Sequence, residues 1–281
     1  MGGAEVIDSH TLWRKLHGAP GVLTKLAAGR TAEVYAWGDD HVLKLFQPGF
    51  PLAYIALELK NARSAHALGL PTPCDAGHVQ WRQRSGIVFE RVDGPTVYEL
   101  IQTVGADCAA LGRQFFDIQQ SIHRCNFSEL LPLQAKLAER IRLAKGLPQT
   151  LRVEAIDKLL SAPLSETVCH GDFHPMNVIM AASGPVVIDW MDMSRGNPAM
   201  DVMRTLLYLR FGRGPEINQV TRAEFFNAYL ERCREVWFGR MEQLQHWQLP
   251  LAVARMSISS VNEDERSDLM GLIESRHSCI L

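Results

Sequence analysis

The chain lacks the features that mark secreted, membrane-spanning and zinc-ribbon proteins. Its six cysteines are scattered and form no CxxC pair, which argues against a disulfide framework or a structural zinc site. No apolar run approaches the thickness of a bilayer, and the first ten residues carry charge without an apolar segment. The sequence therefore predicts a cytoplasmic protein with no secretory signal and no membrane partner.

The chain also lacks a large excess of charge of either sign. A formal net charge of −2 over 281 residues gives no electrostatic reason to expect a nucleic-acid partner. With 47% hydrophobic and 21% charged residues, the composition is that of a globular protein with one large domain or two lobes.

The first ninety-odd residues have the pattern of a strand-rich lobe with one helix. Residues 26–37 predict two short strands around a turn at Gly29, and a hairpin turn at 38–40 leads into a third strand. Residues 53–68 combine strong helix formers with a recurring apolar face, which predicts a helix. A further hairpin is expected before residue 90.

Beyond Gly94 the pattern changes to long amphipathic helices. A strand-rich interlude is expected from 168 to 190. The helices are expected at about 97–123, 128–145, 151–161, 199–211, 221–245 and 249–275. This order predicts an α+β fold with two domains, a small strand-rich N-terminal lobe with hinge at 1–93 and a larger, mainly helical lobe at 94–281.

The strongest chemical signal is the stretch His170-Gly-Asp-Phe-His-Pro-Met-Asn177. It contains a carboxylate at Asp172 and an amide five residues later at Asn177. A second carboxylate, Asp189, follows an apolar run of β-branched residues that predicts a strand. One carboxylate can orient an attacking hydroxyl while oxygen ligands hold a hard cation, so the pattern is typical of a Mg-nucleotide phosphotransferase.

The order of these features resembles the aminoglycoside phosphotransferase and choline kinase-like family, whose fold is related to that of protein kinases. Residues 170–177 resemble the HGDxHxxN loop of that family, and Ile188-Asp189-Trp190 resembles its metal-binding segment. Residues 196–201 resemble the motif that follows, and 87–94 resemble the hinge between the lobes. The resemblance covers roughly residues 20–235 and implies a bilobal protein kinase-like fold.

The resemblance implies transfer of the γ-phosphoryl group of ATP or GTP to a hydroxyl of an aminoglycoside-type antibiotic or related metabolite. Asp172 would orient that hydroxyl, and Asn177 and Asp189 would bind Mg²⁺. A small-molecule acceptor is the expected partner, and the expected state is a monomer or weak dimer. The residues expected to contact the nucleotide are Lys44 with its companion Glu58, Gly29 and Thr31 in the phosphate-covering turn, and Phe89, Glu90 and Val92 in the hinge.

Several of these residues also have simpler interpretations. Lys44 can be an exposed lysine on a half-solvated strand, any hairpin offers a turn like that at Gly29, and Phe89 can belong to the core. Acidic residues suited to a polycationic acceptor, Glu224, Glu231, Glu235, Glu263-Asp264-Glu265 and Asp268, also fit solvated helix faces. Trp190, Trp237 and Trp247 can pack helices or enclose a quaternary ammonium group.

Three other functions fit parts of the pattern. A choline or amino-alcohol kinase differs only in its acceptor. A non-catalytic nucleotide-binding regulator has the same fold without phosphoryl transfer. A zinc hydrolase would use His170 and His174, but Gly171 and Pro175 disfavour the helix that would place both imidazoles on one face.

Overall fold

The computed structural model describes residues 6–8, 11–12, 23–212, 218–258, 261–275 and 280–281. By their contacts the residues form two compact units. The first comprises Met1–Gly94 with Ile179–Asp192, and the second comprises Pro95–Val178 with Met193–Leu281. The domain ranges 1–93 and 94–281 stay a prediction; the contact pattern groups residues 179–192 with the N-terminal part.

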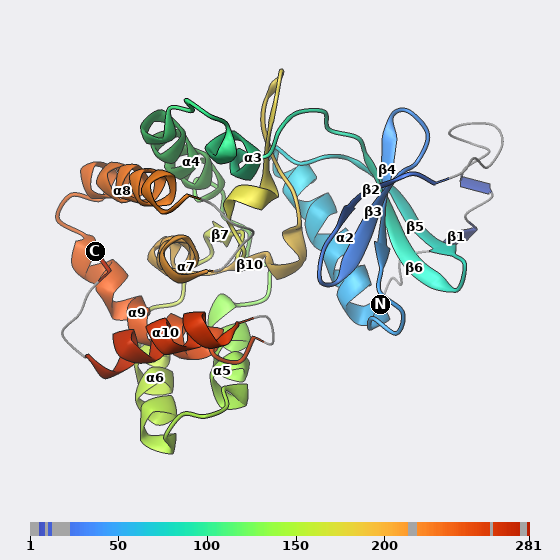
Figure 1. The fold of residues 1–281 in the computed structure, drawn as a ribbon. Helices are drawn as coiled ribbons and strands as arrows, with labels where there is room; N and C mark the ends of the chain where they lie inside the picture. The colour runs from blue at the N-terminus through green and yellow to red at the C-terminus, as the bar shows by residue number, and fades with distance from the viewer. Residues whose placement is uncertain (1–5, 9–10, 13–22, 213–217, 259–260, 276–279) are drawn as a thin grey trace. The chain divides into compact units, whose positions relative to one another are not determined.

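The first unit is built on a sheet of six strands in the order β1-β5-β6-β4-β3-β2 (Figure 1). β1 pairs in parallel with β5, and the other neighbouring strands pair antiparallel. The strands are β1 (Val6–Asp8), β2 (Lys25–Ala28), β3 (Ala32–Ala36), β4 (His41–Phe46), β5 (Asp75–Trp81) and β6 (Arg84–Glu90). Most of a separate hairpin, β8 (Val178–Ala181) with β9 (Gly184–Val187), also belongs to this unit.

Alternation along β4 sends its side chains to two cores. Leu43 and Leu45 are buried in one apolar cluster of the sheet. Phe46 belongs to a second cluster, which it forms with helix α2 (Leu52–Ala67). Lys44 is two residues from Phe46, so the period of two places it on the α2 side of the sheet. The charged side chain of Lys44 therefore faces helix α2.

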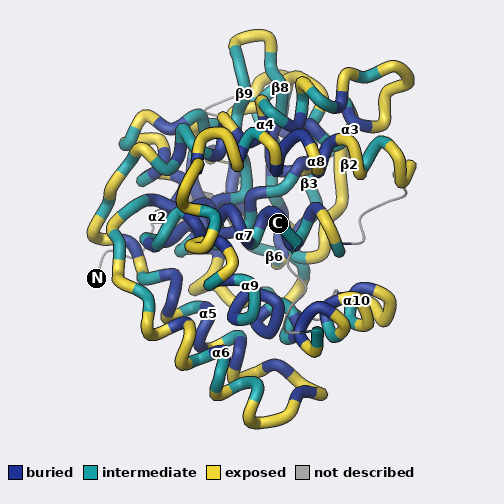
Figure 2. The backbone as a smooth tube through the Cα atoms, turned by 90° about the vertical axis from the view of Figure 1, so that its left-hand side faces the viewer, coloured by how far each residue is buried: buried dark blue, intermediate teal, exposed yellow. Residues whose placement is uncertain are grey.

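The second unit is mainly helical. Nine of the 14 residues of α7 are buried, so this helix runs through the core of the unit (Figure 2). None of the described helices combines the length and apolar sequence that crossing a lipid bilayer requires. The helices are α3 (Val97–Gln102), α4 (Cys108–Ile122), α5 (Leu133–Leu143), α6 (Gln149–Ser161), α7 (Pro198–Phe211), α8 (Gln219–Val236), α9 (Met241–Arg255) and α10 (Glu263–Glu274), with two short paired strands, β7 (Val168–Cys169) and β10 (Ser194–Arg195).

The predicted α+β fold, strand-rich first and mainly helical afterwards, is confirmed. The helix predicted over 97–123 is wrong in one respect, because it is two helices. Gly105 adopts a φ of 79°, and the Asp107 side chain caps α4 by accepting the Ala110 N–H. The helix predicted over 221–245 is likewise broken, with Gly239 at a φ of 76° between α8 and α9.

Gly112 lies where α4 packs against α8. A Cβ at this position would come within 2.5 Å of the Phe225 carbonyl oxygen and 2.9 Å of the Ala228 Cβ. We expect Gly112→Ala to lower the free energy of unfolding by about 1–3 kcal/mol, although alanine is the better helix former. Urea unfolding measures this change.

Gly271 in α10 provides the matched control, because a Cβ there meets no atom within 4 Å. We expect Gly271→Ala to raise the free energy of unfolding by about 0.5–1 kcal/mol through helix propensity alone. A Gly112→Ala variant as stable as Gly271→Ala would contradict the close approach of α4 and α8.

Candidate active site

Lys44 is shared between two carboxylates in the first unit. Its Nζ lies 2.5 Å from Glu58 Oε1 and 3.1 Å from Asp189 Oδ1, and its side chain is 14% exposed. Glu58 lies on the buried face of α2 with Ile55 and Leu59. The structure therefore brings together three residues that the sequence predicts to act on the nucleotide and metal; those roles stay predictions.

Among Lys44, Glu58 and Asp189, the degree of burial determines whose charge is costly to keep in the folded protein. Glu58 is buried, and its Oε2 has no hydrogen-bond partner among the described residues. Burial raises the pKa of Glu58 to about 7, against the opposing charge of Lys44. Burial also acts to lower the pKa of Lys44, but the charges of Asp189 and Glu58 outweigh it and raise that pKa. The cluster therefore holds a firmly protonated lysine.

Asp189 adopts a left-handed backbone conformation, with a φ of 65°. Residues other than glycine rarely adopt it, so the surrounding structure has to hold it. Asn61, one turn from Glu58 on α2, donates from Nδ2 to the Trp190 carbonyl oxygen at 2.9 Å. The Trp190 indole donates to the Val187 carbonyl oxygen at 3.0 Å. These bonds flank Asp189, whose side chain remains 37% exposed beside Lys44.

Gly29 and Thr31 lie in the turn between β2 and β3. The Gly29 N–H donates to the Ala32 carbonyl oxygen, and the Thr31 carbonyl oxygen accepts the Gln47 N–H, both at 2.8 Å. A Cβ at Gly29 would lie 3.5 Å from its nearest neighbour, so this turn does not require glycine. β2 is exposed along its length (Figure 2). Contact between this turn and phosphate stays a prediction.

The predicted hinge follows β6. Phe89 is buried in the α2 cluster, which fits its interpretation as a core residue. The Glu90 N–H donates to the Cys74 carbonyl oxygen at 2.8 Å, and the Arg91 N–H donates to a carbonyl oxygen of the β3–β4 turn at 2.8 Å. No described residue accepts a hydrogen bond from the Val92 N–H. Of these three main-chain donors, Val92 is the one open to a ligand.

Asp172 lies in the second unit, on a tight loop in which Gly171 has a φ of 79°. Arg204 Nη2 donates to Asp172 Oδ1 at 3.2 Å, and His174 Nε2 lies 3.6 Å from Oδ2. Partial burial acts to raise the pKa of Asp172, but His174 and the charge of Arg204 outweigh it and hold that pKa well below its usual range. So weak a base is suited to orienting a hydroxyl rather than to removing its proton.

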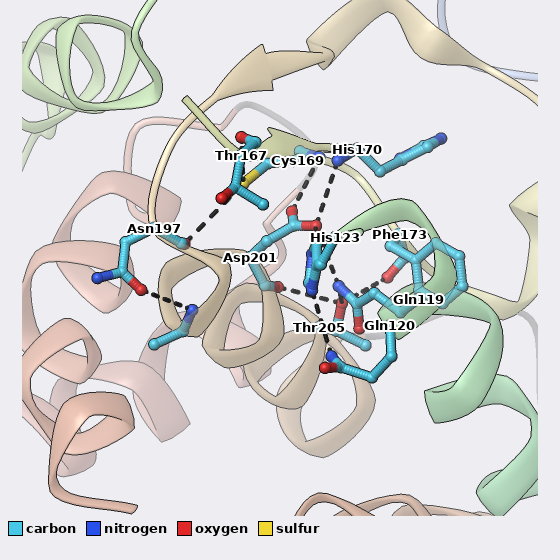
Figure 3. Close-up of polar contacts among 12 residues, drawn as sticks. Gln119, Gln120, His123, Thr167, Cys169, His170, Phe173, Asn197, Asp201 and Thr205 are labelled. Carbon is cyan, nitrogen blue, oxygen red and sulfur yellow. Dashed lines mark hydrogen bonds and ion pairs between the residues drawn. The ribbon is translucent and has the colours of Figure 1, made fainter. Parts of the chain in front are cut away.

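Asp201, near the start of α7, organises the backbone of this loop. Its Oδ1 accepts the Gly171 N–H at 2.9 Å, and its Oδ2 accepts the His170 N–H at 3.2 Å (Figure 3). Gln119 Nε2 and His123 Nε2 lie 3.2 and 3.0 Å from Oδ2. Burial acts to raise the pKa of Asp201, but its hydrogen bond with His123 and the charge of that ring contribute to lowering it to about 2.

Two further residues of α7 hold the other side of the loop. Thr205 Oγ1 donates to the Phe173 carbonyl oxygen at 3.0 Å (Figure 3). The Tyr208 ring stacks on His174, with 4.6 Å between centroids and 15° between planes. Asp201, Thr205 and Tyr208 are spaced four and three residues apart, so they share one face of the helix. That face fixes the loop on both sides of Asp172.

Asn177 ends the short 3-10 helix Pro175–Asn177 that follows the loop. Its Nδ2 donates to the Asp172 carbonyl oxygen at 3.0 Å and lies 3.2 Å from His174 Nε2. These contacts commit the amide nitrogen and leave Oδ1 as the atom that can bind a cation. His170 is buried, and its Nδ1 accepts the Asp172 N–H at 3.2 Å. The two histidines have different partners, which does not favour the zinc interpretation.

Among the described residues, one cluster of three His, Cys, Asp or Glu side chains has ligand atoms within 4.8 Å of one another, and it consists of His123, Cys169 and Asp201. Both oxygens of Asp201 already accept hydrogen bonds. Burial raises the pKa of the Cys169 thiol well above its usual value, whereas metal binding needs the thiolate. These three side chains therefore fit a buried hydrogen-bonded network better than a metal site.

A comparison with protein families identifies the class of protein. The model of the phosphotransferase enzyme family matches residues 22–236. The chain belongs to this family. It is a phosphotransferase with an alcohol group as acceptor. A search of curated proteins found no match.

Solved kinase structures resemble this phosphotransferase at low identity. An aminoglycoside-3′-phosphotransferase of type VIII is 17% identical with a TM-score of 0.61, over 88% of this chain and 97% of that one. An amicoumacin kinase in complex with AMP-PNP and Ca²⁺ is 16% identical with a TM-score of 0.58, over 90% and 87%. A choline/ethanolamine kinase family protein from Mesorhizobium loti is 19% identical with a TM-score of 0.54, over 94% and 91%. These likenesses confirm the predicted protein kinase-like fold.

Three polar residues of the phosphotransferase that hold these loops, Asn61, Arg204 and Thr205, are not predicted by the sequence motifs. Asn61 follows Glu58 by three residues and thus shares its helix face, which is a signal visible in the sequence. Arg204 and Thr205 follow Asp201 by three and four residues in the same way. The sequence does not show which loop each of these two helix faces contacts.

Glu58 couples the stability of the phosphotransferase to pH. Its pKa is raised from 4.5 to about 7 on folding, so the folded state binds this proton more tightly within that window. The contribution of Glu58 is therefore fully present below the lower pKa and is lost as pH rises through the higher one. Its size is at most on the order of 3 kcal/mol.

We accordingly expect Glu58→Gln, which cannot ionise, to gain stability relative to wild type between about pH 5 and about pH 8. Urea unfolding of both proteins at each pH measures the difference. A difference independent of pH would show that Glu58 titrates normally.

Proposed function

We propose that the protein transfers the γ-phosphoryl group of ATP or GTP to a hydroxyl of an aminoglycoside-type antibiotic or related metabolite. The observation that carries this proposal is the Asp172 carboxylate. It lies on a loop anchored to α7, is held by Arg204, and has a side chain that is 41% exposed. A carboxylate fixed in this way can orient an acceptor oxygen for in-line attack.

The nucleotide is assigned to the residues of the first unit. Lys44, held by Glu58, contacts the α- and β-phosphates as a protonated amine. The Gly29–Thr31 turn covers the phosphates with main-chain N–H groups. At the hinge, the Val92 N–H meets the base edge, because the neighbouring N–H of Glu90 is already bonded.

Mg²⁺ is the cofactor that the donor set fits. Asp189 offers a partly exposed carboxylate, and Asn177 offers an amide oxygen whose nitrogen is committed to the protein. Oxygen ligands of this kind suit a hard cation. When bound, Mg²⁺ supplies positive charge to the phosphates during transfer.

The acidic residues considered for a polycationic acceptor are partly committed to other contacts. Glu235 lies 2.7 Å from Arg113 and 3.1 Å from Arg232. Glu265 is buried against Arg255. These pairs favour the interpretation of Glu235 and Glu265 as structural charges.

A choline or amino-alcohol kinase is the second candidate, supported by the likeness to the choline/ethanolamine kinase family protein. Trp190, Trp237 and Trp247 do not add support, because all three are buried and fit the packing interpretation. A non-catalytic regulator is the third candidate, and the presence of Asp172, Asn177 and Asp189 argues against it.

A coupled nucleotide-turnover assay tests the proposal. Aminoglycosides, amino alcohols and neutral hydroxyl metabolites are supplied with ATP and with GTP in parallel. Acceptor-dependent release of nucleoside diphosphate is expected for one acceptor class. Tight nucleotide binding without turnover of any acceptor would favour the regulator.

Asp172→Asn tests the role of the carboxylate with little change in shape. We expect kcat to fall by at least about 10²-fold, because the acceptor hydroxyl loses the group that orients it. Nucleotide affinity, measured by calorimetry, should stay within about twofold, because the donor residues are unchanged. Turnover at the wild-type rate would contradict the mechanism.

Asp189→Asn tests the metal. Asparagine tolerates the left-handed conformation found here, so the backbone is preserved. We expect the affinity for Mg-nucleotide to fall by at least about tenfold, with a much smaller change for nucleotide in EDTA. Calorimetry with and without Mg²⁺ separates the two, and equal losses in both would remove Asp189 as a ligand.

A further inference from the structure

Arg204 contacts the carboxylate on which the proposed reaction depends. Among the described residues it is the one side chain that donates to the Asp172 carboxylate within 3.5 Å, at 3.2 Å to Oδ1. The nearest His174 nitrogen lies 3.6 Å from Oδ2, too far for a hydrogen bond. The Arg204 side chain is 14% exposed and that of Asp172 is 41% exposed. The guanidinium is therefore more sheltered from solvent than the carboxylate it holds.

The rest of the α7 face holds the backbone of the loop rather than this side chain. Asp201 accepts the N–H groups before Asp172, and Thr205 donates to the carbonyl oxygen of Phe173 after it. With the backbone held on both sides, the remaining freedom of Asp172 lies in its side-chain torsions. Arg204 follows Asp201 by three residues on α7, and its hydrogen bond to Asp172 Oδ1 restricts that freedom.

We propose that Arg204 is a positioning residue for phosphoryl transfer, which holds the Asp172 carboxylate in the orientation that aligns an acceptor hydroxyl. The proposal rests on the proposed function of Asp172. A guanidinium suits this task, because its planar array of donors sets the direction of a hydrogen bond as well as a charge. Loss of the alignment slows the chemical step, since a misplacement of about 1 Å can cost about 10²-fold in rate.

Three single variants separate positioning from charge and from general stability. Arg204→Met removes the donors and keeps an unbranched stem, and Arg204→Lys keeps the charge. Arg210→Met is the matched control, because it removes a charge from the same helix at an exposed residue whose guanidinium lies 5.7 Å from the Phe226 ring centroid. The measurements are kcat and KM with an acceptor that the wild type phosphorylates, and nucleotide affinity by calorimetry.

We expect Arg204→Met to lower kcat by about 10- to 100-fold with nucleotide affinity within about twofold of wild type. Arg204→Lys should recover part of the loss, and Arg210→Met should match wild type. A kcat of Arg204→Met within about twofold of wild type overturns the proposal. If Arg204→Met does not fold, Arg204→Lys decides in its place, and a kcat equal to wild type overturns the proposal.

A double mutant shows whether Arg204 acts through Asp172. Arg204 is proposed to act only by orienting the Asp172 carboxylate, which the Asp172→Asn variant lacks. Adding Arg204→Met to Asp172→Asn should therefore change the residual rate by less than about threefold. A further loss as large as that of the single variant overturns the proposal. Absence of turnover by both wild type and Arg210→Met overturns the proposed function, and this proposal with it.

Discussion

One buried carboxylate determines the shape of the loop that carries Asp172. Asp201 accepts the N–H groups of two successive residues, His170 and Gly171, and would be costly to bury if it were unpaired. The His123 ring, which directly follows α4, lies 3.0 Å from its Oδ2. The loop, the buried helix α7 and α4 are thereby joined in one polar network inside an apolar core, and the orientation of Asp172 depends on that network.

The first unit uses the same construction with different residues. One face of α2 supplies Glu58 to the sheet lysine and Asn61 to the backbone that follows Asp189. In each unit, then, a buried helix face holds the backbone beside a carboxylate that the sequence predicts to be functional. The two units differ in how charges are paired. Lys44 forms ion pairs with two carboxylates, Glu58 and Asp189, whereas Asp172 forms its ion pair with the guanidinium of Arg204.

Periodicity and motif order were enough to predict the α+β fold, and the family resemblance predicted the proximity of Lys44 to Glu58. They did not predict the break at Gly105, because apolar residues recur on both sides of it. Arg204 and Asn61 were missed for another reason. Their partners lie 32 and 129 residues away, and a single sequence does not show which distant segment a polar side chain meets.

Under the proposed function, the anchoring of residues 170–174 also affects the thermodynamics of acceptor binding. Four of these five residues, all but Asp172, have a backbone group or ring fixed by α7, so much of their conformational entropy is lost when the chain folds. Little is left to lose when an acceptor arrives, because the carboxylate proposed to orient it is already ordered. Differences in affinity among acceptors therefore reflect the ordering and desolvation of the acceptor itself more than any rearrangement of this loop.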